Sequence, residues 1–243
     1  SNSVLTVAML TSCEQIGDNQ LLICGTYTEM RGAQTGSHGV YSLAFDAKTG
    51  ILSVIDSAQA YNPSYVAISN EHDLIYAVKE TGKDAGVYTI PCNKDTGKLG
   101  VAEFCEGTSA DPCYVALFNG KLLTADYSGG AVTVFGMNDN GKVDGRLTCV
   151  NLADNSISTD EEVSHAHTVN PINNESALVI TDLGTHRVYF AVKSQTNNSG
   201  FAITDTVQLE KGFGPRHIDV TPDGKYCYIL GELSGLIQSL CLD

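Results

Sequence analysis

The chain of 243 residues has no tryptophan, and it has only 14 lysines and arginines against 28 aspartates and glutamates. The resulting net charge of −14 at pH 7 argues against nucleic acid or an anionic membrane as a partner. The apolar run at residues 4–10 is too short to span a bilayer. No long stretch has apolar residues at helical spacing. These absences predict a chain built from β-strands.

The eight cysteines form no Cys-x-x-Cys pair and have no zinc-like spacing. Most of them lie in apolar, strand-like stretches, where a free thiol acts as a small hydrophobic side chain. We therefore expect reduced thiols in the core, with a disulfide as the alternative. Reduced thiols fit a reducing compartment, and we expect a cytoplasmic protein.

Residues 1–19 are expected to form a leader or the remnant of a lipoprotein signal. Leu10-Thr11-Ser12-Cys13 looks like a lipoprotein processing site, although no basic flank precedes it. An ordinary β-strand or a disordered leader explains the same residues equally well. The alternative to a cytoplasmic location is thus an exported lipoprotein with a lipid anchor on Cys13, and no other membrane partner is expected.

A strand-sized phrase returns about every fifty residues, which indicates repeated structural units. It reads Gly39-Val40-Tyr41 and then Gly86-Val87-Tyr88, and weaker copies begin at Gly130, His186 and Gly235. Turn-forming residues lie between the strand-like runs. Each unit therefore consists of several short strands joined by turns.

Two further phrases keep the same period and the same order. One reads Tyr65-Val66-Ala67-Ile68 and recurs at 114–117, 167–170 and 217–220. Behind each copy comes an apolar run that ends in polar residues, at 74–80, 122–127, 178–183 and 227–233. We expect these polar endings to close the innermost strand of each unit and to line a central channel.

Repeats of this length, with about four strands each, predict an all-β fold: a β-propeller of four-stranded blades. A β-sandwich or β-helix is the alternative, but a sandwich does not predict a polar ending at one point of every unit. The unbroken repeat, without a linker rich in proline and serine, predicts a single propeller domain over residues 20–243.

Eight stretches of the chain, taken in order, resemble the lactonase family of seven-bladed propellers. They are residues 21–29, 39–52, 62–69, 74–80, 126–132, 165–167, 181–188 and 214–234. That family includes a bacterial 6-phosphogluconolactonase and a fungal carboxymuconate-lactonizing enzyme. The resemblance implies a metal-free lactonase without a cofactor.

The resemblance also shows a deficit, because about five repeats are present of an expected seven. A propeller must close to avoid open sheet edges. We expect a domain truncated at its C-terminal end. A ring of five blades and a second piece supplied separately are the alternatives.

Arg216 is the strongest candidate for a catalytic residue. It lies between Pro215 and His217 at the expected start of an inner strand, from which its side chain can reach the channel. A guanidinium group binds a carboxylate, a phosphate or a developing oxyanion in bidentate fashion. The structural alternative is an arginine that joins neighbouring blades through carbonyl groups.

Glu232 and His167 are the other expected catalytic residues. Glu232 ends a strand-like run and is expected beside Arg216, and the family pairs its arginine with such a glutamate. His165 and His167 would share one face of a strand, since side chains alternate along it. They form either a metal pair or one channel histidine beside a loop histidine, and no Cys, Asp or Glu completes a metal site.

The expected substrate-binding residues are His165, Tyr127, Asp182, His217 and Glu80. Glu80 follows Lys79 where the family commonly has asparagine, and this departure favours a salt-bridged structural role for Glu80 over substrate binding. Three further departures from the family lie nearby: Asp126 stands for the usual asparagine, Ser164 for proline and His186 for aspartate. They leave the exact substrate open.

The prediction is a hydrolase that opens a sugar-acid lactone, most similar to a 6-phosphogluconolactonase, with the small lactone as its partner. Glu232 or His167 takes a proton from water, and Arg216 stabilises the oxyanion. The alternatives are a cycloisomerase that forms a muconolactone, and a propeller that binds a ligand or protein without catalysis. The oligomeric state stays open.

Overall fold

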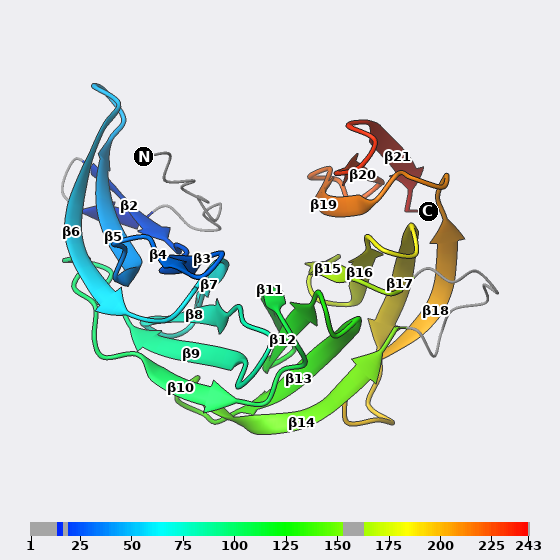
Figure 1. Ribbon diagram of the computed structural model, residues 1–243, viewed down its shortest axis with the longest axis horizontal. Coiled ribbons are helices and arrows are strands. Elements are labelled where there is room, and N and C mark those ends of the chain that lie inside the picture. Colours follow the sequence, from blue (N-terminus) through cyan, green and yellow to red (C-terminus); the bar gives the residue numbers. More distant parts are fainter. Residues whose placement is uncertain (1–13, 17–18, 153–162, 243) are drawn as a thin grey trace.

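Five β-sheets stand side by side around a common centre and form an open ring (Figure 1). The computed structural model describes residues 14–16, 19–152 and 163–242, and within these ranges every regular element is a strand. The predicted all-β propeller with about five blades is therefore confirmed. No helix in the described ranges is long and apolar enough to cross a membrane.

Each sheet follows the chain from the centre of the ring outward, and we call the sheets blades 1 to 5. Blade 1 has β1 (Glu14–Ile16), β2 (Asn19–Cys24), β5 (Gly39–Asp46) and β6 (Ile51–Gln59). Blade 2 has β7 (Val66–Ile68), β8 (Leu74–Lys79), β9 (Gly86–Pro91) and β10 (Glu103–Glu106). Blade 3 has β11 (Pro112–Phe118), β12 (Lys121–Asp126), β13 (Ala131–Met137) and β14 (Val143–Asn151).

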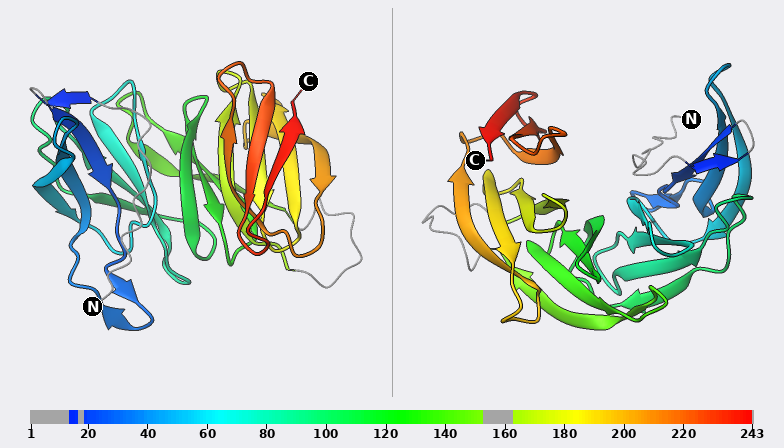
Figure 2. Two further views of the ribbon diagram at one scale, coloured as in Figure 1. Left: turned by 90° about the horizontal axis from the view of Figure 1, so that it is seen from above. Right: turned by 180° about the vertical axis from the view of Figure 1, so that it is seen from behind.

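Blade 4 has β15 (Ala166–Ile172), β16 (Ala177–Asp182), β17 (Arg187–Lys193) and β18 (Phe201–Gln208). Blade 5 has three strands, β19 (Pro215–Val220), β20 (Tyr226–Gly231) and β21 (Ile237–Cys241). The short hairpin of β3 (Glu29–Met30) and β4 (Ala33–Gln34) stands out from blade 1 on one face of the ring (Figure 2).

Local turn chemistry explains why neighbouring strands pair antiparallel. At the turn between β5 and β6, the Asp46 carboxylate accepts a bond from the Lys48 N–H at 2.8 Å and one from the Thr49 hydroxyl at 2.7 Å. Gly50 then adopts a φ of 74°, a backbone conformation that residues with a Cβ rarely adopt. The turn residues recognised in the sequence thus reverse the chain within a blade.

The hydrophobic core lies between the blades. The middle strand β8 is covered on both faces, and Leu74, Ile75, Tyr76, Ala77 and Val78 are all buried, whereas Lys79 at its end is half-buried. Four clusters of buried side chains each join two neighbouring blades. A polar contact adds to this packing where the Tyr76 hydroxyl of blade 2 donates to the Gly141 carbonyl of blade 3 at 2.6 Å.

Among the residues that the structure describes, blade 5 packs against a neighbouring blade on one side only. In β20, Cys227 and Ile229 are buried against blade 4, whereas Tyr226, Tyr228 and Leu230 are 44% to 46% exposed on the other face. That face borders the gap in the ring between β21 and blade 1 (Figure 1).

Two sequence expectations need correction. The polar endings that were expected to close the innermost strands close the second strands instead, because β8, β12 and β16 lie between two partners in their sheets. The innermost strands carry the phrase that begins at Tyr65. In addition, Cys149 and Cys241 are exposed and do not lie in the core, whereas Cys105 is partly buried against the core between blades 2 and 3.

The other thiols and the N-terminal segment are placed as follows. Cys24 and Cys227 are buried free thiols, as expected, and Cys113 is a half-buried one. Glu14–Ile16, inside the range assigned to a leader, pairs with β2 as the innermost strand of blade 1. Cys13, the expected lipid anchor, lies outside the described residues.

Candidate active site

Antiparallel pairing brings Arg216 and Glu232 together. The second residue of β19 is Arg216, Glu232 directly follows β20, and the register pairs Pro215 with Gly231. The Nε atom of Arg216 lies 2.8 Å from Oε2 of Glu232 in a close ion pair, although its N–H is not aligned for a hydrogen bond. Both side chains are more than two fifths exposed. The sequence prediction that these two groups are neighbours is borne out in the structure.

The backbone of Arg216 is held by blade 4. The Thr181 hydroxyl donates to the Arg216 carbonyl at 2.8 Å, and Thr181 in turn shares a hydrogen bond of 2.7 Å with Thr168. In the loop before β19, the Gly214 N–H donates to Nδ1 of His186 at 3.2 Å. His186, which departs from the family pattern, therefore supports the loop that carries Arg216.

His167 faces the same ion pair from blade 4. Its Nε2 lies 3.9 Å from Oε2 of Glu232, and only 9% of its side chain is exposed. Burial first, and then the positive charge of Arg216, lower the pKa of His167 to about 3. The imidazole is therefore neutral at pH 7. We call Arg216, Glu232, His167, His217 and Tyr127 the central cluster.

His165 does not form a pair with His167 on one strand face. It precedes β15, and the ladder between β15 and β16 shifts register between Ala166 and Thr168. The ring of His165 stacks on Tyr127 at 4.4 Å and 12°, and its Nδ1 lies 3.0 Å from the Tyr127 carbonyl oxygen. Of the two sequence interpretations, the loop histidine beside a channel histidine is the one observed.

His217 lies at the centre of an aromatic group. Its ring centroid is 5.3 Å from that of His167, 6.1 Å from Tyr65 and 6.2 Å from Tyr114. Burial, followed by the charge of Arg216, lowers the pKa of His217 to about 4. The inner surface beside Arg216 is therefore a neutral aromatic wall at pH 7. Tyr65 and Tyr114 were not predicted as site residues, although both begin copies of the inner-strand phrase.

Asp182 and Asp126 are fully buried and hold loops. Asp182 Oδ1 accepts the N–H groups of His165, Gly184 and Thr185 at 2.8 Å to 3.1 Å, and Oδ2 accepts the Ser164 hydroxyl at 2.6 Å. The carboxylate of Asp182, which was predicted to bind substrate, is therefore buried and bonded to the loop that carries His165.

Asp126 has the same place in blade 3. It accepts bonds from the Ser109 N–H and from the hydroxyls of Thr124 and Thr133, at 2.6 Å to 2.9 Å. Burial raises the pKa of Asp126 to about 6, and these three donors only partly offset that rise.

Glu80 lies on blade 2, where two hydroxyl groups hold its carboxylate in place of a cation. The Tyr27 hydroxyl donates to Oε2 at 2.7 Å, and Ser64 donates to the same oxygen. The expected salt bridge is therefore replaced by neutral donors. Tyr27 and Ser64 carried no signal in the sequence, because neither belongs to the repeated polar endings.

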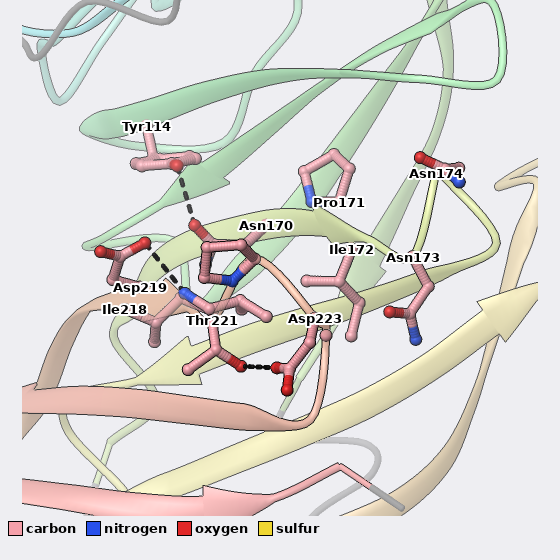
Figure 3. Close-up of a pocket in the computed structure, with 13 residues that line it drawn as sticks. Tyr114, Asn170, Pro171, Ile172, Asn173, Asn174, Ile218, Asp219, Thr221 and Asp223 are labelled. Carbon is pink, nitrogen blue, oxygen red and sulfur yellow. Dashed lines mark hydrogen bonds between the residues drawn. The ribbon is translucent and has the colours of Figure 1, made fainter.

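The described residues contain no group of three or more His, Cys, Asp and Glu side chains that could hold a metal ion. Two pockets, of about 560 and 850 Å³, lie near the C-terminal ends of the inner strands. The central cluster lies at the other end of these strands, where His167 and Arg216 are near the starts of β15 and β19. The smaller one, between blades 4 and 5, is lined by Asn170, Asp219 and Thr221, and Tyr114 donates to Asn170 at its edge (Figure 3). These pockets contain neither Arg216 nor Glu232, so the chemistry favours the central cluster as the site.

A family model described as a lactonase with a 7-bladed β-propeller matches residues 21–243. Among similar sequences, a 6-phosphogluconolactonase of Bacillus subtilis is 28% identical over 224 residues, which cover 89% of this chain and 60% of that protein. An uncharacterised protein of Staphylococcus saprophyticus is 29% identical over 221 residues, 89% of this chain and 61% of its own length. The chain thus spans 60% to 61% of the length of these relatives.

Solved structures agree with this likeness. A protein of Bacteroides uniformis, named as a candidate 6-phosphogluconolactonase, has a TM-score of 0.83 and 29% identity, covering 93% of this chain and 65% of that one. A periplasmic gluconolactonase of Pseudomonas aeruginosa has a TM-score of 0.74 at 22% identity, covering 93% of this chain and 64% of that one. The second likeness concerns the fold alone.

Proposed function

Because the chain belongs to the lactonase family of seven-bladed β-propellers, we propose that it hydrolyses a sugar-acid lactone at the central cluster. Relatives named 6-phosphogluconolactonase support the reaction class. The finer proposal is that the substrate is 6-phosphogluconolactone or the corresponding unphosphorylated lactone, and that the protein acts in the cytoplasm. The alternative location is that of an exported lipoprotein.

One observation carries this proposal: Glu232 holds Arg216 by its Nε while the outer end of the guanidinium group stays available. Among the described residues, no side chain accepts a bond from either terminal nitrogen of Arg216. Those nitrogens are not sealed from solvent, and the side chain is 41% exposed. A fixed, open guanidinium fork suits the oxyanion that develops when a lactone carbonyl is attacked.

The choice of general base follows from exposure and charge. Glu232 is 46% exposed, so a water molecule beside it is accessible to substrate, whereas His167 is only 9% exposed. His167 is also a poor proton acceptor, since its pKa is about 3. We therefore assign the proton transfer to Glu232, and we assign to neutral His167 the orientation of water or carbonyl by hydrogen bonding.

The proposed reaction balances without any added group. Glu232 takes a proton from water as the oxygen attacks the lactone carbonyl, and Arg216 stabilises the resulting oxyanion. The tetrahedral intermediate then collapses, the bond between the carbonyl carbon and the ring oxygen breaks, and Glu232 returns its proton to that oxygen. The product is the open hydroxy acid. Tyr127 and His165, stacked beside the cluster, are proposed to contact the sugar ring.

The test measures the opening of 6-phosphogluconolactone and glucono-δ-lactone above their spontaneous rates. We expect Glu232→Gln to lose about 10²–10⁴-fold in kcat and Arg216→Met to lose about 10²–10³-fold. The matched control is Glu210→Gln on the exposed surface, which should keep the full rate.

Two results would contradict the proposal. If the protein leaves both lactones at their spontaneous rates, it is not a lactonase of this class, and a binding role becomes the better explanation. Formation of a muconolactone from cis,cis-muconate, abolished by the same two substitutions, would instead identify a cycloisomerase.

A further inference from the structure

Glu80 occupies the position in blade 2 that Glu232 occupies in blade 5. Each comes directly after the second strand of its blade, β8 or β20, and both therefore lie on the same face of the ring. Arg216 pairs with Glu232. The pKa of Glu80 is raised, chiefly by burial, and the charge of Arg216 is the smallest of the influences that oppose this rise. The two carboxylates thus approach one central region from different blades.

The surroundings of the two carboxylates differ in a way that separates their roles. Glu232 is paired with a cation, whereas Glu80 receives two hydroxyl bonds, from Tyr27 and Ser64, on a single oxygen, Oε2. The other oxygen, Oε1, has no hydrogen-bond partner among the described residues and is not sealed from solvent. Glu80 therefore presents one fixed, open acceptor.

The backbone around Glu80 is rigidly held. Its N–H donates to the Asn62 carbonyl at 3.1 Å, and the Asn62 side chain donates back to the Glu80 carbonyl at 3.3 Å. The oxygen of that side chain accepts the N–H groups of Thr28 and Glu29, both at 2.9 Å. This network ties the segment that carries Tyr27 to the end of β8. An acceptor that is held before substrate arrives costs little ordering entropy on binding.

We propose that Glu80, held by Tyr27 and Ser64, binds a hydroxyl group of the substrate and selects a polyhydroxylated lactone. This inference rests on the proposed lactonase function. A sugar-acid lactone offers hydroxyl donors around its ring while its carbonyl lies at Arg216. An alkyl lactone offers none and would leave the half-buried carboxylate partnered on one oxygen only. A dicarboxylate such as muconate would place like charge beside Glu80.

Chemical precedent sets the size of the effect. A site built to hydrogen-bond a substrate hydroxyl rejects an analogue that lacks it by as much as about 10⁴–10⁵-fold. Glu80 is one of several expected polar contacts, so we expect it to supply roughly 10–100-fold of the discrimination. Burial is the main cause that raises the pKa of Glu80, and the two hydroxyl donors lower it. The open oxygen accepts a hydroxyl bond in either protonation state.

The experiment compares kcat/KM for glucono-δ-lactone with that for δ-valerolactone, which has the same ring without hydroxyl groups. Glu80→Ala should lower the ratio of the two values by roughly 10–100-fold, with most of the loss on glucono-δ-lactone. Tyr27→Phe should lower it less, because Ser64 still holds Oε2. Glu210→Gln serves as the matched carboxylate control, and thermal unfolding checks that each variant is folded.

The outcomes separate this inference from the proposed function. If Glu80→Ala slows both lactones equally, or leaves the ratio unchanged while Arg216→Met abolishes opening, the lactonase stands and the role of Glu80 is structural. If the unaltered protein opens neither lactone, both proposals fall.

Discussion

Replacing the buried Asp126 by asparagine should stabilise the protein at neutral pH and leave it nearly unchanged in acid. Burial raises the pKa of this carboxyl from its ordinary value of 3.8 to about 6. Between those two values the folded state keeps a proton that the unfolded state has already lost. Stability therefore falls as pH rises through this window and stays reduced above it.

The magnitude follows from the same numbers. At 1.36 kcal/mol for each pKa unit, the rise to about 6 corresponds to about 3 kcal/mol at pH 7.5. Asparagine keeps the hydrogen bonds, since its oxygen can accept the Ser109 N–H and the Thr133 hydroxyl while its amide donates to Thr124. We expect Asp126→Asn to gain about 2–3 kcal/mol at pH 7.5 and close to nothing at pH 4.

Urea unfolding of both proteins at intervals from pH 4 to pH 8 provides the assay. The titration of all other groups cancels in the difference between the two free energies of unfolding.

Two control variants separate the effect of the charge from the effect of the hydrogen bonds. Asp126→Ala leaves three buried donors unpaired and should destabilise at both ends of the range. Asp182→Asn, at the equivalent place in blade 4, weakens three N–H bonds to a carboxylate and should lose about 1–3 kcal/mol at pH 7.5. A difference between Asp126→Asn and the unaltered protein that does not change with pH would refute the reasoning.

Two further predictions concern the blade contacts and the site. Tyr76→Phe should lower the free energy of unfolding, measured in urea, by about 1–3 kcal/mol, because it leaves the Gly141 carbonyl without its buried donor between blades 2 and 3. A change of less than about 0.3 kcal/mol would show instead that water replaces the hydroxyl. Arg216→Met should raise the pKa of His167 above about 3 but keep it below 6.5, since burial is the larger cause, and an NMR titration that finds no rise would contradict the proposed proximity of the two groups.

The site shows where sequence reasoning succeeds and where it stops. Arg216 and Glu232 could be predicted as neighbours because they lie at the same end of one hairpin, β19 to β20, where Pro215 pairs with Gly231. The choice between two arrangements of His165 and His167 could not be made, because it depends on a register shift in β15. Tyr27 and Ser64 could not be found at all. They meet Glu80 only because blades 1 and 2 pack together.

The burial of the carboxylates in these polar endings also could not be predicted from the sequence. Asp126 and Asp182 belong to polar endings in the sequence, as Glu80 and Glu232 do. The structure shows that the aspartates are the last residues of β12 and β16, whereas the glutamates come one residue after β8 and β20. The structure buries the first two completely and leaves Glu232 nearly half exposed. Similarly, the pKa values of His167 and His217 depend on desolvation by side chains from several blades and on the charge of Arg216.

By itself, the sequence determined the all-β class, the repeated unit and the antiparallel pairing within each blade. These depend on turn residues and on the alternation of side chains, and both are set by residues that lie close together in the sequence. Only the tertiary structure decided which side chains face each other across blades, which carboxylates are removed from water, and that the polar endings belong to the second strands. Those properties arise from distances between residues far apart in the chain, and electrostatic energies depend on such distances and on the surrounding solvent.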